Sequence, residues 1–427
     1  MTHDNEEMGS HDGKEMESHD GKEMESHDEG MVWREAAVDR VLELREAIVA
    51  DQPTETVPLA ETAGRTLAEE VVAERDLPPM SRSTMDGYAF DATDDYPLAL
   101  REEEIFPEDD PPSLESGEAV RIFTGAPLPP EANAVLKQEH ATVENGQLRG
   151  NPISPGTYTY ERGSNVAAGE QLFSTGERIS PKDALLLGDL GADEIEVHER
   201  FDVALLATGT EIHEGRQRDL DSPMLSGLLQ SWGHEPTYEG TVPDEFPGVR
   251  DRIADLADGH DVVVTTGGTS VGDKDHVVRA LGELGEVLFH RVRIRPGKPI
   301  AVARLPDHGA VVVAIPGKPV GAHAVTTLVA RPLFIGETEL PTVSATLTTD
   351  VGIGVSGFAY VVPVLLEEGT ATPLGHVDSP LSVYETTFDP SVLSSSTRAS
   401  RADGFLVVKS DRAAGETVDV VPYPVVE

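Results

Sequence analysis

A chain of 427 residues carries 77 acidic and 33 basic side chains, which gives a formal net charge of −44 at pH 7. It contains no cysteine, which excludes disulfides, thiolate metal sites and cysteine nucleophiles and fits a cytoplasmic protein. No apolar run approaches the ~18 residues of a membrane span, and no basic stripe is present to contact nucleic-acid phosphates. At roughly 150 residues per domain, the length predicts about three domains.

The acidic excess admits two interpretations. One is an acid-rich DNA mimic or cation buffer. The other is a salt-adapted, halophilic surface, on which screening relieves the self-repulsion of the carboxylates. The acidic residues are spread over the whole chain, and this favours the salt-adapted surface.

Residues 1–30 read as an acidic tail. An eight-residue repeat, "MGSHDGKE", "MESHDGKE" and "MESHDEG", occupies 8–30 and has no apolar face. Such a segment cannot bury enough apolar surface to fold, so we expect disorder. Its histidines are able to chelate a transition metal ion weakly, although a solvated tail is the simpler interpretation; they are His11, His19 and His27.

The elements up to residue 200 mix helices with short strands. "WREAAVDRVLELREAIV" predicts a helix, because its apolar residues recur at helical spacing. The stripe consists of Ala37, Val41, Leu44 and Ile48. The stretch 57–90 predicts a short strand, a helix and a proline-rich turn, and 100–160 predicts a β-rich module. The stretch 172–200 begins like a strand, and it predicts a helix from about Pro181 and a strand near 194–198.

Residues 202–334 alternate strands with helices. "DVALLAT", "DVVVTT" and "AVVVAI" are buried-strand runs, and between and after them lie the helical patterns "DSPMLSGLLQSWG", with Asp221 as a candidate cap, "FPGVRDRIADLADG", "DHVVRALGELG" and "PVGAHAVTTLVARPLF". This alternation predicts parallel βαβ units, and hence an α/β fold with a doubly wound parallel sheet. Residues 340–427 alternate short strands with Gly and Ser turns, which predicts a small β-domain and favours a barrel.

A glycine-rich loop follows one of these strands in "VVVTTGGTSVGDKDH". Ligands bind beyond the carboxyl ends of the strands in such sheets. Gly267 and Gly268 allow backbone N–H groups to approach an anion closely, and a helix after Gly272 would present its positive end. The alternative is a tight turn with no ligand, which a double glycine alone does not exclude.

Basic residues gather nearby in a chain that is short of them. "RVRIRPGKPIAV" carries Arg291, Arg293, Arg295 and Lys298, and Lys318 lies at another strand-to-helix turn. Pro-Gly-Lys-Pro occurs twice, at 296–299 and 316–319, and forms a rigid turn that projects lysine. Together these loops predict a site for a small polyanion; the alternative is a pair of ordinary turns with solvated lysines.

Carboxylates accompany these anion-binding loops. They are Glu211, Asp244, Asp273 and Asp275, and Asp86 is a further candidate. A carboxylate beside a phosphate is unfavourable unless a cation lies between them, and Mg²⁺ favours such oxygen ligands. Carboxylates also accept hydrogen bonds from N–H-rich heterocycles. The loops are therefore predicted to hold a phosphate, and the acids a metal ion or a base-like ring.

The motifs together resemble the molybdopterin molybdenumtransferase family, the molybdenum insertases (MoeA) that include the E domain of gephyrin. The resemblance covers roughly residues 31–427 and rests on seven ordered motifs: "PPMSRSTMDGYAF", "RIFTGAPLPPEANAV", "ATGTEI", "VPDE", "TTGGTSVGDKDH", "RIRPGKPIAV" and "IPGKPVGA". The reaction it implies is Mg²⁺-dependent insertion of molybdate into adenylylated molybdopterin, with release of AMP.

The resemblance also implies an organisation. Its domains are a discontinuous linking domain at 31–55 and 156–198, an inserted β-rich domain at 56–155, an α/β molybdopterin-binding domain at 199–337 and a C-terminal β-barrel at 338–427. It implies a homodimer with sites at the subunit interface, and it allows transient contact with the adenylyltransferase and with apo-molybdoenzymes.

The motifs carry site residues over to this chain. Catalytic roles fall on Asp86, Thr124, Glu211, Asp244 and Asp275, of which Asp244 and Asp275 are candidate Mg²⁺ ligands. Substrate binding falls on Gly267, Gly268, Ser270, Gly272, Arg291, Arg295, Lys298, Pro316, Gly317, Lys318 and Pro319. The chain departs from the family pattern at Thr210, Pro223, Lys318 and Asn133. A paralogue that inserts tungstate, a non-catalytic pterin-binding or scaffold protein, and a molybdopterin adenylyltransferase therefore stay open as alternatives.

Overall fold

The computed structural model describes residues 30–269 and 275–427. It divides into two compact units, of which one holds the chain up to Ala47 together with Phe201–Glu427, and the other is Ile48–Arg200. The repeat tail and its histidines lie outside the described residues. Within the described ranges, no helix is both long and apolar enough to cross a membrane.

The first unit contains a six-stranded sheet in the order β14-β13-β15-β19-β18-β16. The strands are β13 (Val203–Thr208), β14 (Thr237–Val242), β15 (Val262–Thr266), β16 (Glu286–His290), β18 (Ala301–Leu305) and β19 (Ala310–Ile315). β14, β13, β15 and β19 are parallel, whereas β18 is antiparallel to both of its neighbours, β19 and β16. The α/β prediction is confirmed, with two further strands, β18 and β16, added at one edge through antiparallel pairing.

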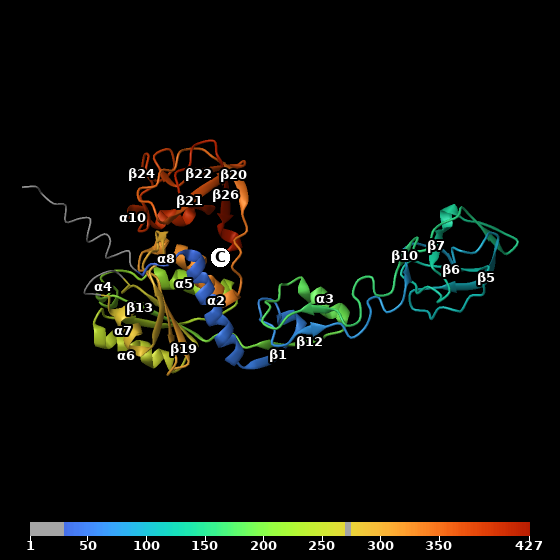
Figure 1. Ribbon diagram of the computed structural model, residues 1–427, viewed down its shortest axis with the longest axis horizontal. Helices are drawn as coiled ribbons and strands as arrows, with labels where there is room; N and C mark the ends of the chain where they lie inside the picture. Colours follow the sequence, from blue (N-terminus) through green and yellow to red (C-terminus); the bar gives the residue numbers. More distant parts are fainter. Residues whose placement is uncertain (1–29, 270–274) are drawn as a thin grey trace, which may run out of the picture. The chain divides into compact units, whose positions relative to one another are not determined.

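Helices cover both faces of this sheet (Figure 1). α6 (Phe246–Ala257) and α7 (His276–Leu284) pack against each other and share one apolar core with the sheet. α5 (Asp221–Ser231) packs on β13 and against α8 (Pro319–Val325). α8 continues through a π-helical turn, Thr326–Ala330, into α9 (Arg331–Ile335).

The first helix, α2 (Arg34–Asp51), follows its predicted stripe. Ala37, Val41 and Leu44 are buried, as the spacing predicts, whereas Ile48 is half-buried. The side chain of Arg34 donates to the carbonyl of Leu328 at 3.0 Å, which ties α2 to the segment after α8. The amphipathic pattern therefore located both the helix and most of its buried face.

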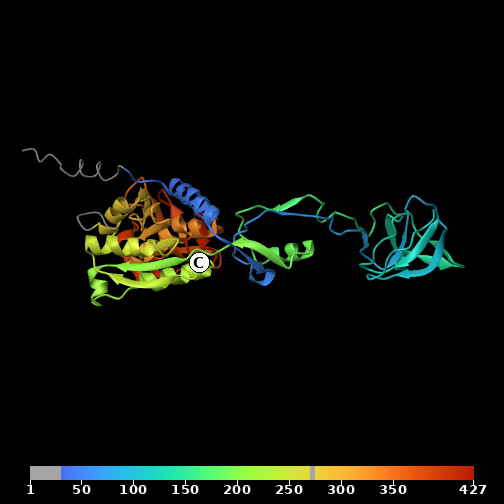
Figure 2. The same cartoon turned by 90° about the horizontal axis from the view of Figure 1, so that it is seen from below.

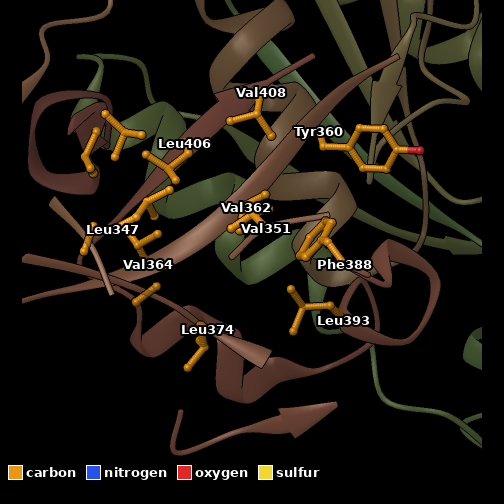
Figure 3. Packing of buried hydrophobic residues seen from close by; sticks show 14 of the residues in the cluster. Leu347, Val351, Tyr360, Val362, Val364, Leu374, Phe388, Leu393, Leu406 and Val408 are labelled. Carbon is orange, nitrogen blue, oxygen red and sulfur yellow. The ribbon is translucent and has the colours of Figure 1, made fainter. Parts of the chain in front are cut away.

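The C-terminal residues form a closed barrel of five strands. These are β20 (Val343–Leu347), β21 (Ala359–Glu367), β22 (Thr370–Pro373), β25 (Gly404–Val408) and β26 (Thr417–Pro422), and the pairing of β21 with β25 closes the ring. Its core packs Val362, Val364 and Leu406 against Phe388 and Leu393 (Figure 3). The predicted barrel is confirmed. A two-residue strand that precedes the barrel in sequence, β17 (Ile294–Arg295), pairs with β21 in the same sheet.

The second unit is rich in short strands (Figure 2). Its largest sheet has the order β7-β4-β6-β5-β9-β8, with β4 (Gly87–Phe90), β5 (Leu98–Ile105), β6 (Glu118–Ile122), β7 (Ala134–Lys137), β8 (Thr142–Glu144) and β9 (Gln147–Arg149). Smaller pairs join β1 (Thr54–Pro58) to β12 (Glu194–His198), β2 (Val71–Val72) to β11 (Gln171–Phe173), and β3 (Arg82–Ser83) to β10 (Thr159–Tyr160). The β-rich module is confirmed, as is the helix α3 (Asp183–Leu190). The division into four domains stays a prediction.

One predicted helix in this unit is wrong. In the described stretch 57–90 no α-helix forms, and a 3₁₀ turn at Leu59–Glu61 is followed by the strand β2. Gly64 has a φ of +78°, a left-handed conformation that interrupts a helix. Leu67 is fully buried and bridges to Val197. Strand pairing therefore overrides a helix-favouring composition here.

Candidate active site

A cleft of about 520 Å³ lies in the first unit, beyond the carboxyl ends of β13, β15 and β19. This is the edge at which ligands bind in open α/β sheets. The loops that follow these strands and the barrel domain both contribute to its wall. The lining residues comprise Thr208, Gly209, Glu211, Ile212, Gln217, Asp244, Thr266, Gly267, Gly268, Thr269, Arg295, Pro296, Gly297, Lys298, Pro299, Pro316, Gly317, Lys318, Gly321, Pro390, Ser391 and Ser394.

The double glycine allows two loops to meet closely. Gly267 and Gly268 have φ values of +84° and +64°. A Cβ at Gly267 would lie 2.6 Å from the carbonyl oxygen of Thr208, and one at Gly268 would lie 2.6 Å from Cγ2 of Val277. The N–H of Gly267 donates to the carbonyl of Ile315 at 2.9 Å. That amide extends the sheet, which differs from the expectation that it points at a ligand.

Basic side chains form another part of the wall. Lys298 belongs to the first Pro-Gly-Lys-Pro turn, Arg295 lies on β17 immediately before that turn, and Lys318 belongs to the second turn. Gly297 has a φ of +114°, and a Cβ there would lie 2.2 Å from Cγ1 of Val325, so the first turn packs tightly against α8. Lys318 immediately precedes α8 and is exposed. The two turns therefore bring three cations to one cleft in a strongly acidic chain.

Two carboxylates, Glu211 and Asp244, reach the cleft from the segments that follow the neighbouring parallel strands β13 and β14. Glu211 lies on the short helix α4 (Thr210–His213), and Asp244 follows β14. The N–H of Asp244 donates to Oγ1 of Thr210 at 3.1 Å. Oδ1 of Asp244 is buried and has no hydrogen-bond partner among the described residues. Thr210, a departure from the family pattern, thus supports the backbone of a site carboxylate.

Asp275 precedes α7, beside this cleft rather than among its lining residues. Its side chain is 18% exposed, and its Oδ1 also lacks a partner in the described ranges. Burial raises the pKa of Asp275 to about 6, and the charge of Asp244 adds to the shift, while the amide of Val278 and the charge of Arg291 oppose it. Two buried carboxylate oxygens without partners, on residues close enough to interact, fit the oxygen ligands that Mg²⁺ prefers.

Several other predicted residues lie at or near the site. Pro316 and Gly317 line the cleft, whereas Pro319 is the first residue of α8 and does not. Arg291 also lies outside the lining; it has a φ of +74° and acts on the charge of Asp275. Ser270 and Gly272 lie outside the described residues.

Asp86 and Thr124 belong to the second unit and contact each other. Oδ1 of Asp86 accepts hydrogen bonds from Oγ1 of Thr124 at 2.7 Å and from its N–H at 2.8 Å. These hydrogen bonds, the side-chain one foremost, lower the pKa of Asp86. The two predicted residues therefore form one hydrogen-bonded pair, with Asp86 ionised.

Sequence reasoning missed the contribution of the barrel to the cleft. Pro390, Ser391 and Ser394 come from α10 (Pro390–Leu393) and the residues after it. Asp389 caps α10, and its Oδ1 accepts from the N–H groups of Ser391 and Val392. The sequence "DPS" is a recognisable helix start. Nothing local, however, indicates that this helix approaches a cleft made by other loops.

The predicted cap at Asp221 is wrong. Oδ1 of Asp219 accepts from the N–H of Ser222 at 3.0 Å, whereas Asp221 is 6% exposed and its Oδ1 has no partner among the described residues. Burial raises the pKa of Asp221 to about 6, and the charge of Asp219 adds to the shift. The aspartate that accepts a backbone N–H at the start of α5 is therefore Asp219, two residues before the predicted one.

Comparison with known proteins agrees with this geometry. The family model "MoeA N-terminal region (domain I and II)" matches residues 34–191, and "Probable molybdopterin binding domain" matches 204–335. A molybdopterin molybdenumtransferase of Synechococcus elongatus is 33% identical over 318 residues, 69% of this chain and 78% of that protein. One from Haemophilus influenzae is 28% identical over 397 residues, 87% of this chain and 94% of that protein.

Solved structures of the same family also resemble this chain. The crystal structure of a molybdopterin biosynthesis MoeA protein from Pyrococcus horikosii is 28% identical, covers 92% of this chain and 99% of its own, and has a TM-score of 0.66. Fold and sequence together define a multidomain transferase of molybdenum cofactor biosynthesis. The chain belongs to the MoeA family of molybdopterin molybdenumtransferases.

Proposed function

We propose that this chain catalyses the Mg²⁺-dependent insertion of molybdate into adenylylated molybdopterin, with release of AMP. One observation carries the proposal. Arg295 and Lys298 line a cleft beside two carboxylates, Asp244 and Asp275, whose buried Oδ1 atoms have no partner among the described residues. Molybdate and the diphosphate are anions that the cations offset. The carboxylates tolerate a diphosphate when a divalent cation lies between them.

In this reaction the protein positions the reacting groups, and no side chain acts as a nucleophile. Water adds at one phosphorus of the phosphoanhydride and the bridging P–O bond breaks, which gives AMP and the phosphate of molybdopterin. The two dithiolene sulfurs bond to molybdenum, and one oxo group leaves as water with the two thiol protons. Neither step uses a protein nucleophile, so a chain without cysteine is suited to it.

Each site residue has a role in this proposal. Asp244 and Asp275 would hold Mg²⁺, which when bound supplies positive charge to the phosphate oxygens. Arg295, Lys298 and Lys318 offset the anions, and Glu211 accepts hydrogen bonds from the N–H groups of the pterin. The proposal includes a homodimer in which Asp86 and Thr124 act on the site of the partner subunit.

Release of AMP tests the proposal directly. The full chain is incubated with adenylylated molybdopterin, Mg²⁺ and molybdate in high-salt buffer, and AMP is measured by chromatography. We expect AMP that depends on both Mg²⁺ and molybdate and that disappears with Asp275→Asn while the fold survives. AMP release that is equal in Asp275→Asn would favour a scaffold, and consumption of ATP with molybdopterin would favour the adenylyltransferase.

A further inference from the structure

A phenylalanine of the barrel domain lies beneath two cations of the cleft. The ring centroid of Phe358 is 4.1 Å from Cζ of Arg295 and 5.8 Å from Nζ of Lys298. Both cations line the cleft, whereas Phe358 is 5% exposed and belongs to the barrel core. One buried ring therefore contacts two charged groups that face a ligand.

Backbone pairing fixes this arrangement. β17 runs alongside β21 with Ile294 opposite Ala359 and Arg295 opposite Tyr360. The N–H of Ala359 donates to the carbonyl of Arg293 at 2.8 Å. Register in a sheet decides which face each side chain takes. The strand pairing thus places Arg295 beside the first residues of β21, which directly follow Phe358 in the chain.

The loop that carries Phe358 is itself held at both ends. The hydroxyl of Tyr360 accepts from the N–H of Val355 at 3.0 Å and donates to its carbonyl at 2.9 Å. Tyr360 also meets Phe388 edge to face, with ring centroids 6.2 Å apart, and its hydroxyl points away from the core cluster (Figure 3). Phe358 therefore lies in a short loop whose two ends, Val355 and Tyr360, are hydrogen-bonded to each other.

The chemistry of an aromatic ring gives this contact a consequence. The face of the ring carries partial negative charge, and it attracts a cation within about 6 Å of the centroid. The long side chains of arginine and lysine lose rotamer freedom when they bind an anion. A ring that already restrains them lowers that loss, and unlike a carboxylate it does not neutralise their charge.

We propose that Phe358 is a positioning residue that holds Arg295 and Lys298 toward an oxyanion in the cleft. The identity of that oxyanion as molybdate rests on the proposed function. Phe358 supplies the interaction from the barrel, so the C-terminal domain takes part in anion binding through its core. A purely apolar role would require volume at this position but not an aromatic ring.

Titration of molybdate into the full chain, followed by calorimetry, tests the proposal. Phe358→Leu keeps an apolar side chain and removes the ring, and we expect it to weaken binding about 2- to 30-fold, the range for one cation–π interaction. Phe358→Tyr keeps the ring and is expected to bind within about 2-fold of the wild type. In the AMP assay, Phe358→Leu should raise KM for molybdate more than it lowers kcat.

Phe405→Leu is the matched control. Phe405 is 1% exposed in the same barrel, on β25, so its replacement removes an equally buried ring without touching the cleft. We expect it to lower the thermal midpoint as Phe358→Leu does and to leave the affinity for molybdate unchanged. Equal affinities of Phe358→Leu and wild type, or equal losses in Phe358→Leu and Phe405→Leu, would overturn the proposal.

Failure of the proposed function is distinguishable from failure of this inference. If wild type does not bind molybdate, the same titrations with inorganic pyrophosphate decide the role of Phe358. Pyrophosphate binding that weakens in Phe358→Leu and recovers in Phe358→Tyr would support the positioning role without molybdate. A wild type that binds neither anion would overturn both.

Discussion

Oδ2 of Asp275 lies 3.8 Å from Nε2 of His290, too far for a hydrogen bond. Burial lowers the pKa of His290 to about 4, and the charges of Arg291 and Lys298 add to the effect. The imidazole is therefore neutral at pH 7, while Asp275, with a pKa of about 6, is ionised. The histidine therefore supplies no positive charge to this carboxylate.

Binding of Mg²⁺ should therefore weaken as the pH falls. The proton and the metal compete for Asp275, and with a pKa of about 6 the apparent affinity is expected to drop roughly 4-fold between pH 7.5 and 5.5. Calorimetric titration of MgCl₂ into the full chain at the two pH values measures this. Asp275→Asn should bind Mg²⁺ weakly and with little pH dependence. A wild-type affinity that is constant across this range would contradict the assignment of Asp275.

Asp221→Asn should stabilise the fold at high pH. The folded-state pKa of Asp221 is raised to about 6 from an ordinary 3.8, so the folded protein holds the proton more tightly than the unfolded chain. Stability is therefore lost as the pH rises from about 4 to 6, and above 6 the full cost is up to about 3 kcal/mol. Asparagine has the same shape and no charge to desolvate.

Urea unfolding at pH 8 and pH 4 measures this effect. Tryptophan fluorescence is a suitable probe, because Trp232 follows the last residue of α5 and Asp221 is the first residue of the same helix. We expect Asp221→Asn to be the more stable protein at pH 8 and to lose most of that advantage at pH 4. An equal difference at both pH values would show that packing, and not ionisation, is responsible.

Thr210→Val should impair the site through Asp244. The substitution keeps the size of the side chain but removes the acceptor for the N–H of Asp244. The loss of one hydrogen bond is worth about 0.5–1.5 kcal/mol, which corresponds to roughly 2- to 13-fold in the affinity for Mg²⁺. Thr210→Ser retains the hydroxyl and should behave like the wild type. If both variants bind Mg²⁺ equally, the hydroxyl does not support the metal site.

Gly268→Ala should destabilise the loop and weaken anion binding. The position has a φ of +64°, and the new Cβ would lie 2.6 Å from Cγ2 of Val277. We expect a loss of about 1–3 kcal/mol, measured by urea unfolding. Gly282→Ala is the matched control, because Gly282 lies in α7 with no atom within 4 Å of its Cβ position. That variant should gain about 0.5–1 kcal/mol. Similar losses in the two variants would refute the contact argument.

Local sequence patterns predicted the parts of the fold that local forces decide. The apolar runs of β13, β15 and β19 are buried strands in the structure, and three of the four stripe residues on α2 are buried. The glycine turn after β15 and the second Pro-Gly-Lys-Pro turn after β19 meet at one cleft, because parallel strands place their carboxyl ends at one edge. The first Pro-Gly-Lys-Pro turn reaches the same cleft because it precedes β18, which is antiparallel to β19.

Features that depend on distant contacts were not predictable in this way. The stretch after Leu59 favours a helix by composition. Leu67 nevertheless forms a β-bridge with Val197, which is more than a hundred residues away in the sequence. Phe358 and Ser391 approach the cleft because the barrel folds against it, and no spacing in the sequence encodes that approach. Asp219, and not the predicted Asp221, accepts the N–H of Ser222 at the start of α5, which depends on the local backbone conformation.

The strand β17 has a consequence for anyone who re-engineers this enzyme. Its two residues pair with β21 although they precede the barrel in sequence by nearly fifty positions. A barrel excised at residue 338, or exchanged for that of a relative, would leave the open edge of β21 free to recruit a foreign strand. Recombination of such proteins should therefore transfer Ile294 and Arg295 along with the C-terminal module.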